Sequence, residues 1–385
     1  MKGLNRVTLF GSVIGLASLL SDWLAFKPNR IASGEGVSIW ETDVVWAALL
    51  AGLWLSCIAL SLRPLSQRSS LVLGGLVNTI FVITFSLAGS TAARLLEGAE
   101  AVNRVSFSGG VWLALVAVYI IIFATSRNLK GVGRAFLQLP GLAIFVVLLL
   151  SGWFDHISLM QEYAANTDRF SQEFLHHIFL FGTSVLAGTL LAVPLGIWAA
   201  SSRRVEKPVF AVTNIAQTIP SLALFGLLMA PLSTLSFNFP WLRDLGISGI
   251  GNAPALIALT IYSLLPIARN TYAGLKQIDP AVVDSGKGMG MNRGQIFRRL
   301  KVPLAAPLVL EGVRNASVAA VGNTAVAALI GAGGLGFFIF RGLGQAAPDL
   351  ILLGALPTVL LALGVDAIMR LVVRLSTPKG IKVPA

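Results

Sequence analysis

Two pairs of oppositely charged residues interrupt otherwise apolar stretches of this sequence. Glu311 and Arg314 stand three residues apart, and Asp366 and Arg370 stand four residues apart. Charged side chains are costly in apolar surroundings, where they are usually either functional or paired with one another. Both spacings place the two charges on one face of a helix. We therefore interpret both pairs as structural ion pairs.

The other residue types that could carry chemistry do not combine into a site. Lys287 stands between glycines but lacks the first glycine and the following Ser or Thr of a phosphate-binding loop. The glycine-rich segment 331–336 matches a dinucleotide pattern by eye, but it follows an apolar stretch and not a strand, which favours a turn. The three histidines and the single cysteine show no metal-ligand spacing: His156, His176, His177 and Cys57. We predict no catalytic, cofactor-binding or metal-binding residue, and no ATP hydrolysis by this chain alone.

Several polar side chains lie within the apolar stretches. Asn214, Gln217 and Ser221 fall on one face of a helix that is predicted to cover 209–230, and Asn323 lies in a later stretch. Polar side chains in an apolar medium face protein or water. These residues either line a path for a polar solute or make ordinary hydrogen bonds between helices, and the sequence leaves both interpretations open.

Residues 279–303 form a polar, basic segment between two long apolar stretches. Asp279 is a candidate N-cap with Pro280 in the first helical position. Glycines at 288 and 290 end this helix, and Asn292 with Gln295 forms a second capping signal. We expect Pro303 to close the second helix and to open the next apolar span, so that the segment forms two short helices with Gly290 at the joint.

Composition defines the class of protein. The chain is 55% hydrophobic and 12% charged, with a mean hydropathy of +0.80, whereas soluble domains carry about 25% charged residues. A membrane-crossing helix needs about 20 apolar residues. We therefore predict an all-α polytopic membrane protein with about ten spans: 7–26, 44–62, 70–89, 110–126, 136–152, 175–200, 209–230, 250–272, 304–330 and 350–369.

The formal charge of +12 follows this topology. When both termini are placed in the cytoplasm, most Lys and Arg residues, including those of 279–303, fall in cytoplasmic loops, as the positive-inside rule requires. The basic balance is therefore a topology signal, and we predict contact with lipid and no nucleic-acid binding.

The chain divides near residue 173. Residues 1–172 form a membrane extension of about five spans whose role the sequence does not define. Residues 173–375 carry five further spans and the polar segment 279–303, and residues 376–385 form a short basic tail.

The polar segment resembles the EAA loop of the membrane subunits of bacterial ATP-binding-cassette (ABC) importers. That pattern is Glu-Ala-Ala, a glycine after three more residues, and then Ile-x-Leu-Pro after nine more. The matching positions here are Asp284, Ser285, Gly286, Gly290, Leu300, Val302 and Pro303. The departures are Asp for Glu, Ser and Gly for the two Ala, Leu for Ile, and Val for Leu. The resemblance covers about Glu173 to Arg374 and is closest to permeases for glycine betaine, choline and carnitine.

The closer resemblance rests on three segments: 214–226, 262–272 and 328–342. It implies a non-catalytic permease subunit in a bacterial inner membrane, with 279–303 docking on cytoplasmic ATP-binding subunits. It also implies a second permease subunit, identical or paralogous, and an external solute-binding protein. The substrate would be a small quaternary ammonium osmolyte. An ABC permease for another solute, such as an amino acid, would share this fold and loop, and an ion-coupled secondary transporter would leave the loop unexplained.

Overall fold

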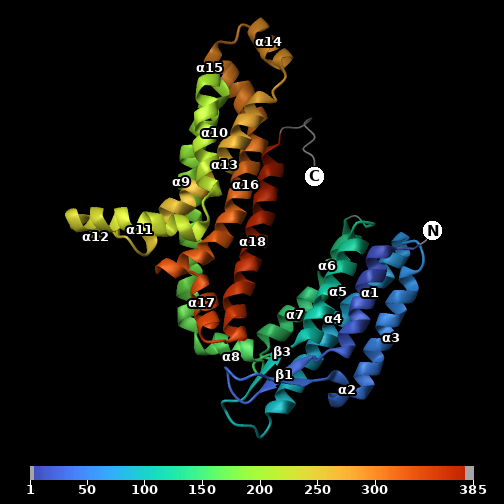
Figure 1. Ribbon diagram of the computed structural model, residues 1–385. Helices are drawn as coiled ribbons and strands as arrows, with labels where there is room; N and C mark the ends of the chain where they lie inside the picture. The colour runs from blue at the N-terminus through green and yellow to red at the C-terminus, as the bar shows by residue number, and fades with distance from the viewer. Residues whose placement is uncertain (1–3, 130, 378–385) are drawn as a thin grey trace. The chain divides into compact units, whose positions relative to one another are not determined.

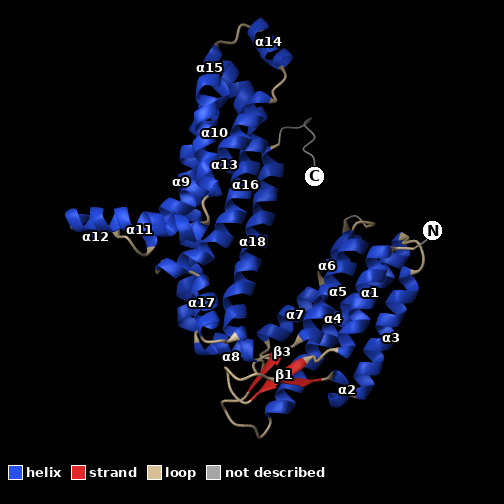
Figure 2. Cartoon of the chain, viewed as in Figure 1, coloured by secondary structure: helices blue, strands red, loops and turns tan. Residues whose placement is uncertain are grey.

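The computed structural model describes residues 4–129 and 131–377, and most of them are helical (Figures 1 and 2). The chain forms two compact units, Met1–Ala165 and Asn166–Ala385. Each unit has its own helical bundle.

The first unit is built on four long helices. α1 (Arg6–Ala17) packs against α3 (Val44–Ser61) and α5 (Gly109–Ser126), and α4 (Gln67–Leu96) packs against α5. A Cβ at Gly15 would lie 2.4 Å from the Trp54 ring, so the glycine lets α1 approach the buried indole on α3. The shorter elements are η1 (Ser18–Leu20), α2 (Ile39–Thr42), α6 (Val132–Gln138), α7 (Pro140–Leu150) and α8 (Ser158–Ala165).

A small antiparallel sheet joins the ends of these helices. β1 (Leu24–Lys27) lies between β2 (Glu35–Val37) and β3 (Arg104–Phe107), with Leu24 opposite both Val37 and Phe107. These strands are not evident from the sequence. Strands of three or four residues are too short to show a clear alternation of apolar and polar positions.

The second unit is a bundle of α9 (Thr167–Ser201), α13 (Asn252–Lys276), α16 (Val302–Ala327) and α18 (Pro348–Ser376). At one end of this bundle lie α14 (Pro280–Gly288) and α15 (Arg293–Gln295), and at the other end lies α17 (Gly336–Gly344) (Figure 1). The remaining elements are α10 (Arg203–Thr218), α11 (Ser221–Asn238), α12 (Trp241–Asp244), η2 (Ile296–Lys301) and η3 (Ala328–Ile330).

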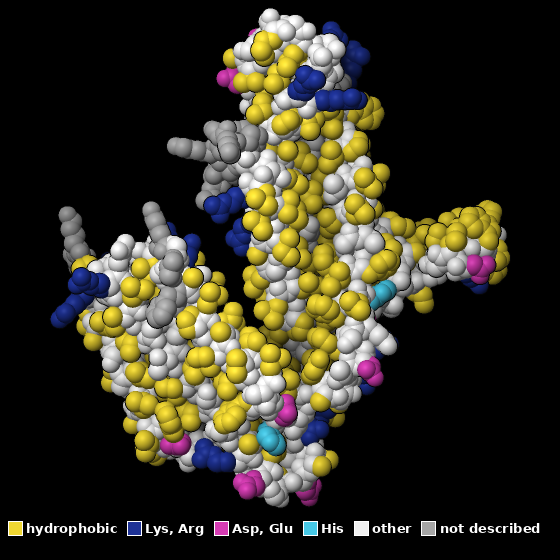
Figure 3. Space-filling view, turned by 180° about the vertical axis from the view of Figure 1, so that it is seen from behind, with side chains coloured by type: hydrophobic (Ala, Val, Ile, Leu, Met, Phe, Trp, Pro, Cys, Tyr) yellow, Lys and Arg dark blue, Asp and Glu magenta, His cyan; other side chains and the backbone are white. Residues whose placement is uncertain are grey.

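The predicted polytopic helical class is confirmed. Within the described residues, eight helices are long and apolar enough to cross a membrane, and Arg6–Leu20 and Pro140–Leu150 are shorter apolar helices. Hydrophobic side chains cover the middle of the second unit, while Lys and Arg gather at the end that carries α14 (Figure 3). This distribution fits a bundle whose flanks contact lipid.

The predicted span 209–230 is wrong as a single helix. α10 ends at Thr218, and α11 begins at Ser221 and projects sideways from the bundle (Figure 1). Between them Ile219 and Pro220 are extended, with ψ of 126° and 142°. A proline disfavours the helical conformation of the residue before it and donates no backbone hydrogen bond. The chain therefore breaks here and does not merely bend.

Candidate functional site

The segment 279–303 folds as its capping residues predict. The Asp279 carboxylate accepts the Ala281 N–H at 2.8 Å, and Pro280 opens α14. Asn292 and Gln295 form a reciprocal capping box, with both N–H···O distances at 2.9 Å. These local predictions are confirmed. We call residues 279–303 the coupling loop, a name that refers only to the role proposed for the segment.

Gly290 ends α14 through a Schellman motif. Its φ is +78°, the Met291 N–H donates to the Gly286 carbonyl at 3.1 Å, and the Gly290 N–H donates to the Lys287 carbonyl at 2.9 Å. This motif requires a left-handed residue at the position that Gly290 occupies, where a residue with a Cβ is disfavoured. The glycine thus fixes the direction in which the chain leaves α14.

Two positions of the EAA-like pattern, Gly286 and Leu300, meet inside the coupling loop. Gly286 is buried, and a Cβ there would lie 2.7 Å from Leu300 Cδ1. Asp284 and Ser285 instead face outward: Asp284 is exposed and binds Lys287 at 2.8 Å, and the Ser285 hydroxyl donates to the Ala281 carbonyl at 2.8 Å. The loop therefore has a packed inner face and a polar outer face.

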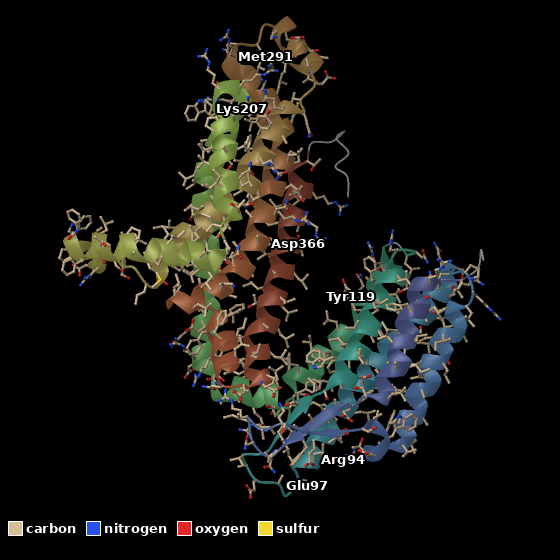
Figure 4. All side chains as sticks on the ribbon, in the orientation of Figure 1. Arg94, Glu97, Tyr119, Lys207, Met291 and Asp366 are labelled. Atoms are coloured by element: carbon tan, nitrogen blue, oxygen red, sulfur yellow. The ribbon has the colours of Figure 1, made fainter. Side chains whose placement is uncertain are left out.

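An exposed apolar residue at the loop escaped the sequence analysis. The Met289 side chain is 70% exposed. Met289 is two residues from Met291, which lies at the same end of the bundle as Lys207 (Figure 4). An apolar side chain between two glycines of a polar loop is the signal that could have revealed it. A flexible exposed methionine suits a contact with another protein.

Pro303 lies at the start of the next long helix, α16, as expected, but the expectation that it closes the preceding helix is wrong. A π-helical turn over Ile296–Lys301 leads directly into α16, so the chain is helical from Arg293 to Ile330. Pro303 is the second residue of α16, so its missing N–H falls just after the π-helical turn, where the hydrogen-bond pattern of the helix changes. Val302 and Pro303 are exposed on this helix. The coupling loop is consequently joined to α16 without a flexible connection.

The polar residues of the broken helix contact α13. The Gln217 amide donates to the Tyr262 carbonyl at 2.8 Å, and the Tyr262 hydroxyl donates to the Ile219 carbonyl at 2.5 Å. Arg269 reaches the Asn214 side-chain oxygen at 3.4 Å. The Ile219 carbonyl has no helical partner at the break, and it thus accepts a hydrogen bond from the Tyr262 side chain of the neighbouring helix.

Ser221 and Asn323 lie apart from Asn214 and Gln217. Ser221 is the first residue of α11, beyond the break, so it does not share a helix face with Asn214 and Gln217 as predicted. Asn323 is half-buried on α16, and within the described residues no hydrogen bond joins it to the side chains of Asn214 and Gln217. The structure therefore brings together Asn214 and Gln217 through α13.

The two charged pairs form one network. Arg314 pairs with Glu311, and Arg370 pairs with Asp366, as their spacing predicts. The structure adds a bond between the helices, because Arg314 Nε lies 2.6 Å from Asp366 Oδ1. Asp366 lies midway along α18 (Figure 4). Within the described residues, no group of three His, Cys, Asp or Glu side chains could hold a metal ion.

Comparisons with known proteins match both units. Residues 192–378 match the family described as binding-protein-dependent transport system inner membrane component. Residues 5–160 match the family described as ABC transporter permease YehY, N-terminal domain.

Curated relatives match the second unit over most of their own length. The choline transport system permease protein OpuBD of Bacillus subtilis is 39% identical over 221 residues, which cover 57% of this chain and 91% of that protein. The carnitine transport permease protein OpuCB of Listeria monocytogenes is 41% identical over 54% of this chain and 87% of that protein. The osmoprotectant import permease protein OsmW of Salmonella typhimurium is 37% identical over 54% of this chain and 91% of that protein.

Proposed function

We propose that this chain, which belongs to the family of inner membrane components of binding-protein-dependent transport systems, imports a small quaternary ammonium osmolyte such as glycine betaine or choline. The observation that carries the proposal is the match over 91% of a choline permease at 39% identity. The relatives named for carnitine and osmoprotectants support the same substrate class.

The coupling loop is the proposed docking site of a cytoplasmic ATP-binding subunit. Its support is local: the loop is an ordered, exposed structure at one end of the bundle, with Met289 and the outward-facing Asp284 and Ser285 available for contact. On this proposal the chain itself is non-catalytic and ATP is hydrolysed by the partner. A second permease subunit and an external solute-binding protein complete the importer.

The broken helix is the proposed wall of the solute path. A helix carries partial negative charge at its C-terminus and partial positive charge at its N-terminus. The end of α10 and the start of α11 meet at Ile219–Pro220, beside Gln217 and Ser221. A zwitterion such as glycine betaine carries both signs of charge, so it matches the two helix ends together with the neutral polar side chains. Asn214 and Asn323 are proposed as further members of this path.

The proposed orientation places the coupling loop and both termini in the cytoplasm of a bacterial cell, with the protein in the inner membrane. It can be tested with single cysteines in a Cys57→Ser background. Met289→Cys, in the coupling loop, should be protected from an impermeant thiol reagent in intact cells, and Leu343→Cys, on α17, should react. The reverse labelling pattern would invert the proposed topology.

The residues up to 172 are proposed to be a membrane extension outside the permease core of 173–375, with 376–385 as a tail. The curated relatives support this division, because their matches cover little more than half of this chain. A truncated chain that begins near residue 166, the start of the second unit, should therefore retain co-purification with the ATP-binding subunit.

Uptake of radiolabelled glycine betaine and choline tests the substrate class. The chain is expressed with its ATP-binding and solute-binding partners in cells that lack their own osmolyte importers. Uptake should require a competent ATP-binding subunit, and unlabelled choline or carnitine should compete while amino acids should not. Uptake that persists with an inactive ATP-binding subunit, or competition by amino acids alone, would contradict the proposal.

A further inference from the structure

Two buried polar side chains of α9 hold the glycine-rich turn that precedes α17. Glu173 and His177 lie one helical turn apart and are 5% and 0% exposed. Glu173 Oε2 accepts the Gly334 N–H at 2.5 Å, and His177 Nδ1 accepts the Leu335 N–H at 3.2 Å. Because Nδ1 is an acceptor, the imidazole proton is on Nε2, which donates to the Val321 carbonyl at 3.0 Å. α9 is thus bonded to both the turn and α16.

Two of the three glycines of this turn, Gly333 and Gly334, leave room for the side chains of Glu173 and His177. Gly331, Gly333 and Gly334 all have positive φ, between 76° and 79°. A Cβ at Gly333 would lie 2.7 Å from Glu173 Oε2, and a Cβ at Gly334 would lie 3.0 Å from His177 Nδ1. The glycine pattern therefore serves the approach of a carboxylate and an imidazole to backbone N–H groups.

A third residue of α9 extends this contact to α17 itself. Arg169 binds Glu173 at 2.5 Å, and its guanidinium lies 4.5 Å from the centre of the Phe337 ring on α17. The helix α17 packs mainly against α18. The Phe170 ring of α9 also lies 6.0 Å from the Phe338 ring of α17, so polar, cation–π and aromatic contacts join the two helices. These contacts lie at the end of the bundle opposite the coupling loop (Figure 1).

We infer that Glu173 and His177 are positioning residues that latch the 331–335 turn, and with it α17, in the closed state of this end of the permease. A carboxylate that accepts a backbone N–H makes a strong, charge-assisted bond, whereas a turn rich in glycine has little conformational preference of its own. Opening this end during transport releases the two N–H groups from α9 and lets α17 move with α18. The role in transport rests on the proposed function, but the latch itself does not.

Hydrogen exchange of the amides in 331–337 tests the latch without a transport assay. The wild-type complex in lipid nanodiscs is compared with Glu173→Ala, which removes the acceptor, and Glu173→Gln, which keeps an acceptor oxygen. We expect exchange to rise at least about tenfold in Glu173→Ala and less in Glu173→Gln. Asp168→Asn is the matched control, because it removes the same charge from an exposed position on α9. Peptides from α13 report whether each variant is folded.

Equal exchange of the 331–337 amides in wild type and a folded Glu173→Ala variant would overturn the latch. If Glu173→Ala proves unfolded, His177→Gln and Glu173→Gln carry the test, and unchanged exchange in both would also overturn it. A latch that opens in the transport cycle must also exchange differently in the nucleotide-free and vanadate-trapped complexes, and equal rates would overturn that role. If the wild-type complex takes up no betaine while the exchange of the 331–337 amides responds as expected, only the proposed substrate is contradicted.

Discussion

Gly290 offers a sharp test of how the coupling loop is shaped. No described atom lies within 4 Å of a Cβ built at this position, so a larger side chain meets no steric obstacle. The only cost comes from the backbone. At a φ of +78°, the left-handed conformation destabilises an L-residue other than glycine by about 1–2 kcal/mol. Gly290→Ala should therefore lower the equilibrium ratio of loops with the Schellman geometry to loops without it by a factor of about 5 to 30.

The response should follow backbone preference and not side-chain volume. Gly290→Asn should be the mildest change because Asn tolerates the left-handed region, and Gly290→Val should be the most severe because it is β-branched. Gly288→Ala is the control, since Gly288 also has open space but is the last residue of α14. Alanine there should stabilise the helix by up to about 1 kcal/mol.

Three measurements check this series: amide exchange across α14, co-purification of the ATP-binding subunit, and solute uptake. Exchange should rise in the order Asn, Ala, Val at position 290 and fall in Gly288→Ala. Uptake and co-purification should decline in the same order at 290, with membrane insertion unchanged. If Gly290→Val matched Gly288→Ala in all three measurements, the Schellman motif would have no part in shaping the docking surface.

Three further changes test the inner face of the loop, the path and the charged network. Gly286→Leu should overpack against Leu300 at a cost of about 1–3 kcal/mol and reduce co-purification with the ATP-binding subunit, and unchanged co-purification would argue against the packed inner face. Gln217→Leu removes one hydrogen bond, worth about 0.6 kcal/mol, which is too little to reduce the yield of the complex. Uptake should therefore fall while the yield stays normal. A parallel fall of uptake and yield would make Gln217 a packing residue. Arg314→Met should lower the free energy of unfolding, measured in detergent, by about 1.5–3 kcal/mol. A change below about 0.5 kcal/mol would show that the bond between Arg314 and Asp366 contributes little to stability.

The coupling loop could be predicted because its structure is local. Asp279, Asn292 and Gln295 cap helices through bonds to residues two or three positions away, so the sequence contains both partners of each bond. The same holds for the pairing of Arg314 with Glu311. The bond from Arg314 to Asp366 crosses between helices and depends on how α16 packs against α18, which no spacing along the chain indicates.

The break at Ile219–Pro220 illustrates the limit of pattern reasoning in a membrane protein. A proline in an apolar stretch either bends a helix or ends it, and the outcome depends on whether the freed backbone groups find partners. Here the partner is the Tyr262 hydroxyl on α13, which accommodates the Ile219 carbonyl. The apolar composition of 209–230 is the same for a bent helix and a broken one. Only the hydrogen bond from Tyr262, a residue of another helix, distinguishes the two cases.

The continuity of Arg293–Ile330 connects the two ends of the second unit. The coupling loop leads through a π-helical turn into α16 without a flexible joint, and the far end of this helix runs into the glycine turn that Glu173 and His177 hold. Between these ends, Arg314 binds Asp366 and so ties α16 to α18. A helix cannot be compressed appreciably along its axis, because its hydrogen bonds fix the rise per residue. If a partner docks on this loop as proposed, its displacement would pass along α16, and the backbone could yield at the π-helical turn and at the three left-handed glycines.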